Sequence, residues 1–193
     1  MPVLEPVPMQ HLDQELQEMI ADGRGAGWLS TPVPIQVLAY APEISKEQLR
    51  QHKGRFEKSR LDSRLKELLR LRIASFNDCR ACKAARKSDK VTEEDVAGLS
   101  SDNENFTPRE RAALKFAELF ATDHMAIGDD VFLELAKHFT KAEIIAVGWA
   151  VSHSLAGGRL MHVLRAWGDD EMEPAIPYED EFAPEKARQA ETV

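Results

Sequence analysis

The sequence predicts an all-α fold, and two observations support this prediction. Hydrophobic residues recur at helical spacing along most of the chain, whereas the alternation of hydrophobic and polar residues that marks a half-buried strand is absent. Three threonines are each followed three residues later by an acidic residue, a pattern that begins helices with a capping box. These pairs are Thr92 with Asp95, Thr107 with Glu110 and Thr140 with Glu143.

The predicted helices follow one another with short breaks between them. Glycines end the first helix, and Pro32 and Pro34 interrupt the chain after it. The last helix is hydrophobic on almost all sides, which is typical of a central helix rather than a surface helix. The segments with helical spacing are 11–25, 45–59, 61–76, 92–99, 107–123, 129–139 and 140–167.

We expect a single helical domain with an appendage at each end. The chain has 193 residues, 43% of them hydrophobic, which is enough for one sizeable core. Residues 1–8 contain three prolines and predict an extended N-terminal arm, and residues 9–168 form the domain. Residues 169–193 hold most of the net charge of −8 together with three more prolines, so we expect an acidic tail without a packed element.

The charge distribution and the hydropathy argue against nucleic acid and membrane as partners. Outside the tail the chain is nearly neutral, and it has no basic stripe with interleaved aromatic residues. No hydrophobic run approaches the roughly 20 residues that a helix needs to cross a bilayer, and the termini contain no signal segment. We therefore expect a cytoplasmic protein, in which a cysteine pair is more often reactive or metal-binding than a permanent disulfide.

Both cysteines lie in the stretch FNDCRACKAARKSD, three residues apart and surrounded by lysine and arginine. Asn77 or Asp78 can cap a helix that begins at Cys79, which places Cys79 and Cys82 on one face, one turn apart. This spacing allows a disulfide to form and reopen with little change of the backbone. The helix N-terminus and the surrounding cations favour the thiolate, which is the reactive form of cysteine.

Three other interpretations of the cysteine pair remain open. A structural zinc site needs about four ligands, and the nearest histidines in the sequence, His52 and His124, are distant from the pair. A thioredoxin-type site needs a strand before this helix, and none is predicted. The two thiols could also be buried core residues without chemistry. We predict neither a metal nor a cofactor.

Arg72 is a candidate binding residue because it interrupts a hydrophobic stripe. It falls near the middle of the leucine-rich face of the helix predicted over 61–76. An arginine buried there needs a carboxylate or carbonyl partner. Alternatively, its aliphatic stem lies along the stripe while its charged head reaches water.

The last helix carries further candidate residues. Arg159 and His162 share a face of this helix, and both Gly157 and Gly158 are unfavourable within it, which suggests a bend or the close approach of another backbone. His153 and His162 are either structural hydrogen-bonding residues or site residues.

The chain resembles the carboxymuconolactone decarboxylase superfamily, in particular its alkylhydroperoxidase D-like branch. Three stretches carry the resemblance: SRLKELLRLRIASFNDCRACKAAR, FTPRERAALKFAEL and HFTKAEIIAVGWAVSHSLAGGRLMHVL. Together they extend over about residues 10–168. The resemblance implies a helical bundle of the alkylhydroperoxidase D-like type that needs no cofactor and assembles as a homo-oligomer, either a trimer, a hexamer or a dimer.

The resemblance also implies catalytic roles for four residues. Cys82 corresponds to the cysteine that attacks a peroxide, and Cys79 to the cysteine that resolves the sulfenic acid into a disulfide. Glu67 corresponds to the glutamate of a proton relay, and Arg86 stands where the family has the histidine of that relay. Arginine cannot shuttle protons near neutral pH because its pKa is above about 12, but it can hold a thiolate as a fixed charge.

Physical arguments from the residues alone point elsewhere at two of these positions. Cys79 is nearer the helix N-terminus than Cys82, so the helix dipole makes Cys79 the more acidic thiol. Glu67 lies opposite the leucine stripe, where a solvated surface carboxylate is the simpler interpretation. Leu71 and Ala74 flank Glu67, however, and a buried position remains open.

The sequence thus predicts a thiol-dependent oxidoreductase that reduces hydroperoxides through its C-x-x-C pair, a peroxiredoxin-type activity. A hydroperoxide or another small molecule would be the substrate, and a dithiol would restore the reduced pair. The catalytic residues would be Cys82, Cys79, Glu67 and Arg86.

Two alternatives belong to other functional classes. One is a decarboxylase or isomerase that acts on a lactone or small carboxylic acid; it would keep its activity when both cysteines are replaced by serine. The other is a non-enzymatic redox sensor or interaction protein, which would form a reversible disulfide without multiple turnovers. The residues available for substrate binding are Arg72, Arg159, His153 and His162.

Overall fold

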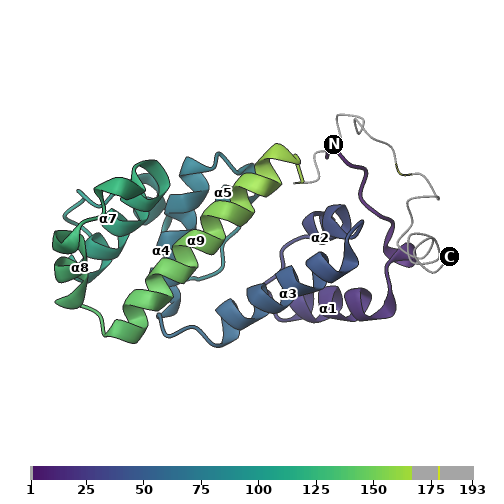
Figure 1. The fold of residues 1–193 in the computed structure, drawn as a ribbon, viewed down its shortest axis with the longest axis horizontal. Coiled ribbons are helices and arrows are strands. Elements are labelled where there is room, and N and C mark those ends of the chain that lie inside the picture. Colours follow the sequence, from purple (N-terminus) through teal and green to yellow (C-terminus); the bar gives the residue numbers. More distant parts are fainter. Residues whose placement is uncertain (1, 167–177, 179–193) are drawn as a thin grey trace. The chain divides into compact units, whose positions relative to one another are not determined.

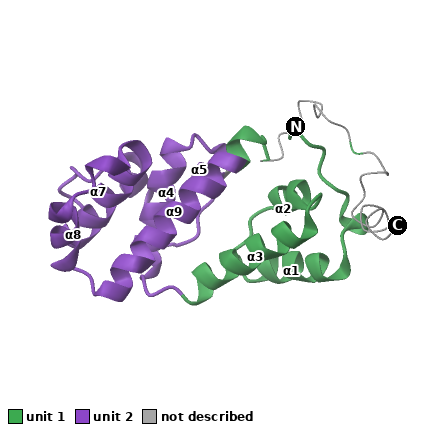
Figure 2. Cartoon of the chain, in the orientation of Figure 1, with its two compact units in different colours: residues 1–58, 161–193 green, residues 59–160 purple. Residues whose placement is uncertain are grey.

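The structure, a computed structural model, describes residues 2–166 and Tyr178, and in this part the chain is helical without β-strands (Figure 1). The predicted all-α class is confirmed. The chain divides into two compact units, coloured green and purple in Figure 2. Unit 1 combines residues 1–58 with 161–193, and unit 2 contains residues 59–160.

Unit 1 has its core between short N-terminal helices. Asp13 begins α1 by accepting a hydrogen bond from the main-chain N–H of Leu16 at 2.9 Å. The sequence did not predict α2, which has only six residues and carries Pro34 in its first turn, where proline is tolerated. The helices are η1 (Met9–His11), α1 (Gln14–Gly25), α2 (Val33–Leu38) and α3 (Pro42–Glu57). The buried core consists of Val7, Leu12, Leu16, Ile20, Trp28, Ile35, Ala39 and Leu49.

The segment predicted as an extended arm, residues 1–8, packs within unit 1. Val7 is buried, its N–H donates to the carbonyl of Gln36 at 3.2 Å, and the Gln36 amide donates back to the Val7 carbonyl at 3.0 Å. The N–H of Tyr178 donates to the Glu5 carboxylate at 2.6 Å. The predicted boundaries of arm, domain and tail stay predictions, and the rest of the predicted tail lies outside the described residues.

Unit 2 is built on helices whose starts the sequence predicted. Both predicted capping boxes before α6 and α7 are present, and Thr140 and Glu143 exchange hydrogen bonds in the same way at the start of α9. The helices are α4 (Ser63–Phe76), α5 (Arg80–Ala84), α6 (Glu93–Ala97), α7 (Pro108–Thr122), η2 (His124–Ala126), α8 (Asp129–Ala136) and α9 (Lys141–Val163), whose final residues belong to unit 1.

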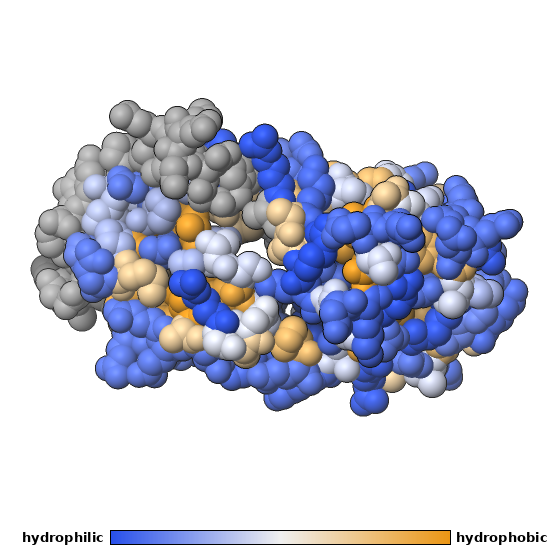
Figure 3. All heavy atoms as spheres, turned by 180° about the vertical axis from the view of Figure 1, so that it is seen from behind, coloured by the Kyte–Doolittle hydropathy of each residue, from blue (hydrophilic) through white to orange (hydrophobic). Residues whose placement is uncertain are grey.

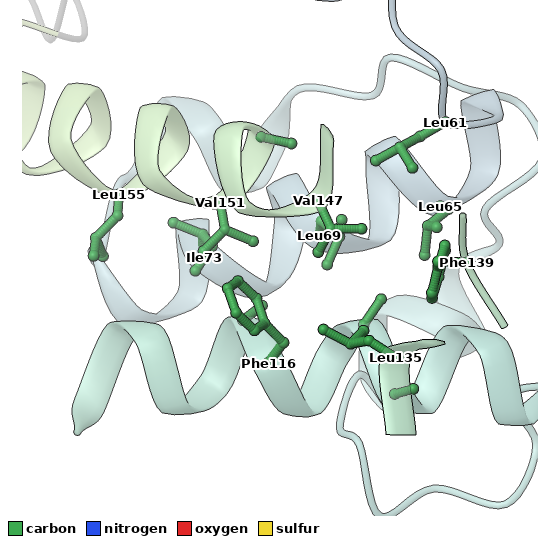
Figure 4. Packing of buried hydrophobic residues seen from close by; sticks show 14 residues of the cluster. Leu61, Leu65, Leu69, Ile73, Phe116, Leu135, Phe139, Val147, Val151 and Leu155 are labelled. Carbon is green, nitrogen blue, oxygen red and sulfur yellow. The ribbon is translucent and has the colours of Figure 1, made fainter. Parts of the chain in front are cut away.

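The leucine stripe of α4 faces the main core of unit 2 (Figure 4). Asp62 begins α4 by accepting from the N–H of Leu65 at 2.9 Å. Side chains from α7, α8 and α9 meet the stripe, and burial of this hydrophobic area stabilises the unit. The labelled members are Leu61, Leu65, Leu69, Ile73, Phe116, Leu135, Phe139, Val147, Val151 and Leu155.

Helix α9 runs beside α4 and is joined to its C-terminal end by a side chain. The Asn77 amide donates to the carbonyls of Ser154 at 3.0 Å and Leu155 at 3.3 Å. A Cβ at position 158 would overlap the Asn77 amide nitrogen, so any other residue there would force the Asn77 side chain to move. The close approach predicted at this glycine is therefore real, but a side chain rather than a backbone makes it.

The surface is mostly hydrophilic on the face drawn in Figure 3, with hydrophobic patches between charged side chains. In unit 2, α8 and α9 expose several large hydrophobic side chains, a surface that can suit a second copy of the chain. They are Phe132, Leu133, Ile145, Trp149 and Leu160. The homo-oligomer stays a prediction. Among the described residues no helix has the length and hydrophobicity to cross a bilayer.

Candidate redox site

Cys79 and Cys82 form a disulfide at the junction of α4 and α5. Their sulfur atoms are 2.05 Å apart and their Cα atoms 5.2 Å apart. The expectation that the C-x-x-C spacing accommodates a disulfide is confirmed. Within residues 2–166 and Tyr178, no group of three or more His, Cys, Asp or Glu side chains is placed to hold a metal ion.

A sharp change of chain direction positions the two cysteines. Helix α4 ends at Phe76, and Asp78 adopts a left-handed backbone conformation with φ of 47° before α5 begins at Arg80. The N–H of Cys82 points at the Cys79 sulfur at 3.3 Å, so this sulfur takes the position of an N-terminal cap. Of the two residues predicted as possible caps, Asn77 and Asp78, Asn77 directs its amide to α9.

The two sulfur-bearing residues differ in their access to solvent. Cys79 is 1% exposed, whereas Cys82 is half-buried. A nucleophile or a peroxide therefore reaches Cys82 more easily than Cys79.

Glu67 is buried against the cysteine segment, and the interpretation as a solvated surface residue was wrong. It is 2% exposed and faces the guanidinium of Arg70, whose Nε and a terminal nitrogen donate to the two carboxylate oxygens at 2.7 Å each. The main-chain N–H of Lys87 donates to one of the same oxygens at 2.9 Å. Both oxygens of Glu67 thus accept hydrogen bonds from protein groups.

Arg70 connects Glu67 to the cysteines, and the sequence did not single it out. Its guanidinium donates to the carbonyl of Cys82 at 2.6 Å and to that of Ala85 at 2.7 Å. The i,i+3 spacing of Glu67 and Arg70 indicated that the pair could form. The contact of this pair with α5 depends on the turn at Asp78, which no helix-spacing rule predicts.

Arg86 lies beyond the end of α5 and is paired with a carboxylate. Its guanidinium donates to both oxygens of Glu93 at 2.9 Å, and this hydrogen bond raises the pKa of Arg86 above its ordinary value. The ammonium of Lys83 contacts Asp78 at 2.6 Å. Burial lowers the pKa of Lys87, and the nearby Arg70 charge lowers it further. The role of Arg86 in holding a thiolate stays a prediction.

The four predicted binding residues are spread over α4 and α9. Arg72 has the carboxylate partner that its position required: its Nε donates to Glu118 at 2.9 Å. Arg159 donates to the carbonyl of Ala121 at 3.1 Å. His153 and His162 both lie on α9. Arg72 and Arg159 thus contact protein groups in this structure. The role of all four residues in substrate binding stays a prediction.

Comparison with known proteins gives no match by sequence and clear matches by structure. No family model matches the sequence, and no curated protein was found as a relative. A peroxidase-related protein of Ralstonia eutropha JMP134 with an alkylhydroperoxidase AhpD core superposes with a TM-score of 0.71 at 18% identity, covering 86% of this chain and 92% of that one. An uncharacterized peroxidase-related protein of Silicibacter sp. TM1040 gives 0.67 at 19% identity, over 88% and 93% of the two chains.

The debrominase Bmp8 is a further structural neighbour. A cysteine-to-alanine variant of it in complex with 2,3,4-tribromopyrrole superposes with a TM-score of 0.72 at 16% identity, covering 97% of this chain and 96% of that one. At such identities the likeness establishes the fold alone. The chain has the all-α fold of alkylhydroperoxidase AhpD-like proteins, with Cys79 just before α5 and Cys82 within it.

Proposed function

We propose that the protein is a thiol-dependent oxidoreductase that reduces hydroperoxides through Cys82 and Cys79. The observation that carries this proposal is the Cys79–Cys82 disulfide, which joins a fully buried residue, Cys79, to a half-buried and therefore more accessible one, Cys82. A pair of this kind can alternate between disulfide and dithiol while the accessible sulfur reacts with small molecules. The fold shared with peroxidase-related proteins supports the same proposed function.

The reaction begins at the reduced pair. The Cys82 thiolate attacks one oxygen of the hydroperoxide, the O–O bond breaks, and the alkoxide leaves as an alcohol after taking a proton from solvent. Cys82 becomes a sulfenic acid. The Cys79 thiol attacks the Cys82 sulfur, the S–O bond breaks, and water leaves. The dithiol is oxidised to the disulfide by two electrons, and the hydroperoxide is reduced to an alcohol and water.

A dithiol reductant closes the cycle. One of its thiolates attacks the accessible Cys82 sulfur and forms a mixed disulfide, and Cys79 leaves as a thiolate. The second thiol of the reductant then releases Cys82 and leaves as part of a cyclic disulfide. Attack at Cys79 is disfavoured because this residue is 1% exposed.

The proposal is tested by following hydroperoxide consumption with dihydrolipoamide in excess. The wild-type protein should consume many equivalents of hydroperoxide. Cys82→Ser should lose the reaction entirely, because it lacks the attacking thiolate. Cys79→Ser, reduced and then freed of the dithiol, should consume about one equivalent quickly and accumulate a sulfenic acid that dimedone traps, since the protein's own resolving thiol is gone.

Two outcomes would contradict the proposal. Wild-type protein that consumes about one equivalent and then stops would be a sensor rather than a peroxidase. Turnover that persists in Cys82→Ser would show that the cysteine pair is not the reacting group.

Reductive dehalogenation is a second candidate, favoured by the likeness to the debrominase Bmp8 over 97% of this chain. In that reaction the dithiol would reduce an organic bromide to the corresponding C–H compound, with release of hydrogen bromide and formation of the disulfide. Release of bromide from 2,3,4-tribromopyrrole, measured with the same reductant and the same cysteine variants, separates this activity from peroxide reduction.

A further inference from the structure

Arg70 makes contacts on both sides of the cysteine site. Toward α4 it is held by the two oxygens of Glu67, and toward α5 it donates to the carbonyls of Cys82 and Ala85. These four hydrogen bonds lie between 2.6 and 2.7 Å, and the Arg70 side chain is 16% exposed. Charge-assisted hydrogen bonds of this length are among the stronger ones in proteins.

Glu67 and Arg70 together form what we call the α4–α5 clasp. Besides its pair with Arg70, Glu67 accepts the N–H of Lys87, so the clasp holds main-chain groups of Cys82, Ala85 and Lys87. Helix α5 has only five residues, and a helix of that length is not stable by itself. The hydrogen bonds of the clasp therefore stabilise the conformation of α5, which the helix could not maintain by itself.

We propose that Arg70 is a positioning residue for the dithiol, a proposal that rests on the function proposed for the cysteine pair. When the disulfide is reduced, the S–S bond no longer fixes the two sulfur atoms, and only the short backbone segment and non-covalent contacts keep Cys82 near Cys79. The clasp then holds the backbone of Cys82 in place, so the two thiols keep a high effective concentration for each other. Without Arg70 the dithiol form gains more freedom than the disulfide form, and the equilibrium shifts toward the dithiol.

Glu67 acts through Arg70 in this scheme. Both of its oxygens accept hydrogen bonds from Arg70, and one also accepts from the main chain at Lys87. A carboxylate in that position orients the guanidinium, and its loss should affect the cysteines by releasing Arg70. Replacing Glu67 and replacing Arg70 should then have overlapping, non-additive effects.

The test is the equilibrium of the full-length protein with glutathione, in which disulfide and two glutathione thiols exchange with dithiol and glutathione disulfide. The fraction of each form is measured by alkylation and mass spectrometry. Arg70→Gln should lower the effective concentration of the two thiols about tenfold, because one buried charge-assisted contact is worth roughly a factor of ten or more. Arg70→Lys keeps the charge but not the forked geometry, and it should lower the value several-fold.

Arg64→Gln is the matched control. Arg64 also lies on α4 and forms ion pairs, with Asp95 and Glu110, and its remaining hydrogen bond goes to the carbonyl of Lys90, so these bonds lead away from α5. Its replacement should change the effective concentration by less than twofold. The proposal is overturned if Arg70→Gln stays within twofold of wild type, or if Arg64→Gln shifts the equilibrium as much. Should Arg70→Gln fail to fold, Arg70→Lys decides by the same criterion.

The mutant cycle with Glu67→Gln separates positioning from a direct role of Glu67. If Glu67 acts through Arg70, the double variant should match Arg70→Gln alone within twofold. Independent, multiplicative effects would contradict the clasp. The equilibrium needs no peroxide turnover, so the positioning proposal and the peroxidase proposal can fail separately.

Discussion

Arg64 and Arg70 lie on the same helix, α4, and are held by similar contacts that lead to different parts of unit 2. Arg64 donates to the carboxylates of Glu110 and Asp95 at 2.7 to 2.9 Å and to the carbonyl of Lys90 at 2.6 Å. Arg70 is held by Glu67 and donates to carbonyls of the cysteine segment. Both guanidinium groups are partly buried, and each makes four hydrogen bonds.

The difference lies in what the partner groups do. Asp95 and Glu110 are the acidic members of the capping boxes that begin α6 and α7, so the Arg64 network fixes the starts of two helices. The Arg70 network includes the carbonyl of Cys82, the less buried of the two cysteines. The same interaction thus stabilises the fold at one end of α4 and orders the site at the other.

The largest expected effect comes from leaving each arginine without its buried carboxylate. Glu67→Ala should lower the free energy of unfolding by about 3 to 5 kcal/mol, because it leaves Arg70 as an uncompensated charge in a nearly buried position. Glu110→Ala should cost about 2 to 3 kcal/mol, since Arg64 keeps Asp95. Urea denaturation measures both, with the exposed Glu43→Ala as the control. A larger loss in Glu110→Ala than in Glu67→Ala would contradict the comparison.

A smaller loss of stability is expected at the contact that follows the C-terminal end of α4, where Asn77 donates hydrogen bonds to α9. Gly158→Ala should destabilise the protein by about 1 to 3 kcal/mol, because the new methyl group overlaps the Asn77 amide. Asn77→Ala also loses hydrogen bonds, but it makes room for that methyl group. The double variant should therefore be more stable than the sum of the two losses predicts, and simple additivity in urea denaturation would exclude the contact.

The smallest effect concerns the pH dependence of the Arg64 end. The hydrogen bond from Arg64 lowers the pKa of Asp95 from 3.8 to about 2. The stability that this pair contributes is therefore complete above pH 3.8 and is lost as the pH falls toward about 2. Asp95→Asn should be less stable than wild type by about 1 kcal/mol at neutral pH, and the gap should close over that window. A stability difference between wild type and Asp95→Asn that stays constant from pH 5 to pH 2 would argue against the lowered pKa of Asp95.

The sequence predicted the parts of the fold that local rules determine. Three Thr–acid pairs predicted the starts of α6, α7 and α9, because a capping box needs only two residues three positions apart. The leucine stripe of α4 also follows from helical spacing, and a carboxylate or carbonyl partner was one of the two alternatives that the sequence left open for Arg72. Helix α2 was missed because six residues carry too little periodicity to detect.

The candidate site was predictable in its cysteines but not in the residues around them. The spacing of Cys79 and Cys82 indicated a disulfide, yet spacing along α4 favoured an exposed Glu67. The face that holds Glu67 and Arg70 is covered only because the chain turns at Asp78 and folds α5 back onto α4. A tertiary contact of this kind leaves no periodic pattern in the sequence.

The sulfur of Cys79 accepts a hydrogen bond from the N–H of Cys82 and so caps the start of α5, the helix that contains Cys82. Substitutions at position 79 therefore differ in more than reactivity. A serine keeps an acceptor at the start of α5 and removes only the resolving thiol, whereas an alanine also removes the cap. For trapping a bound substrate at Cys82 without disturbing α5, Cys79→Ser is the better choice, and any difference between it and Cys79→Ala reports how far the redox centre also serves as its own scaffold.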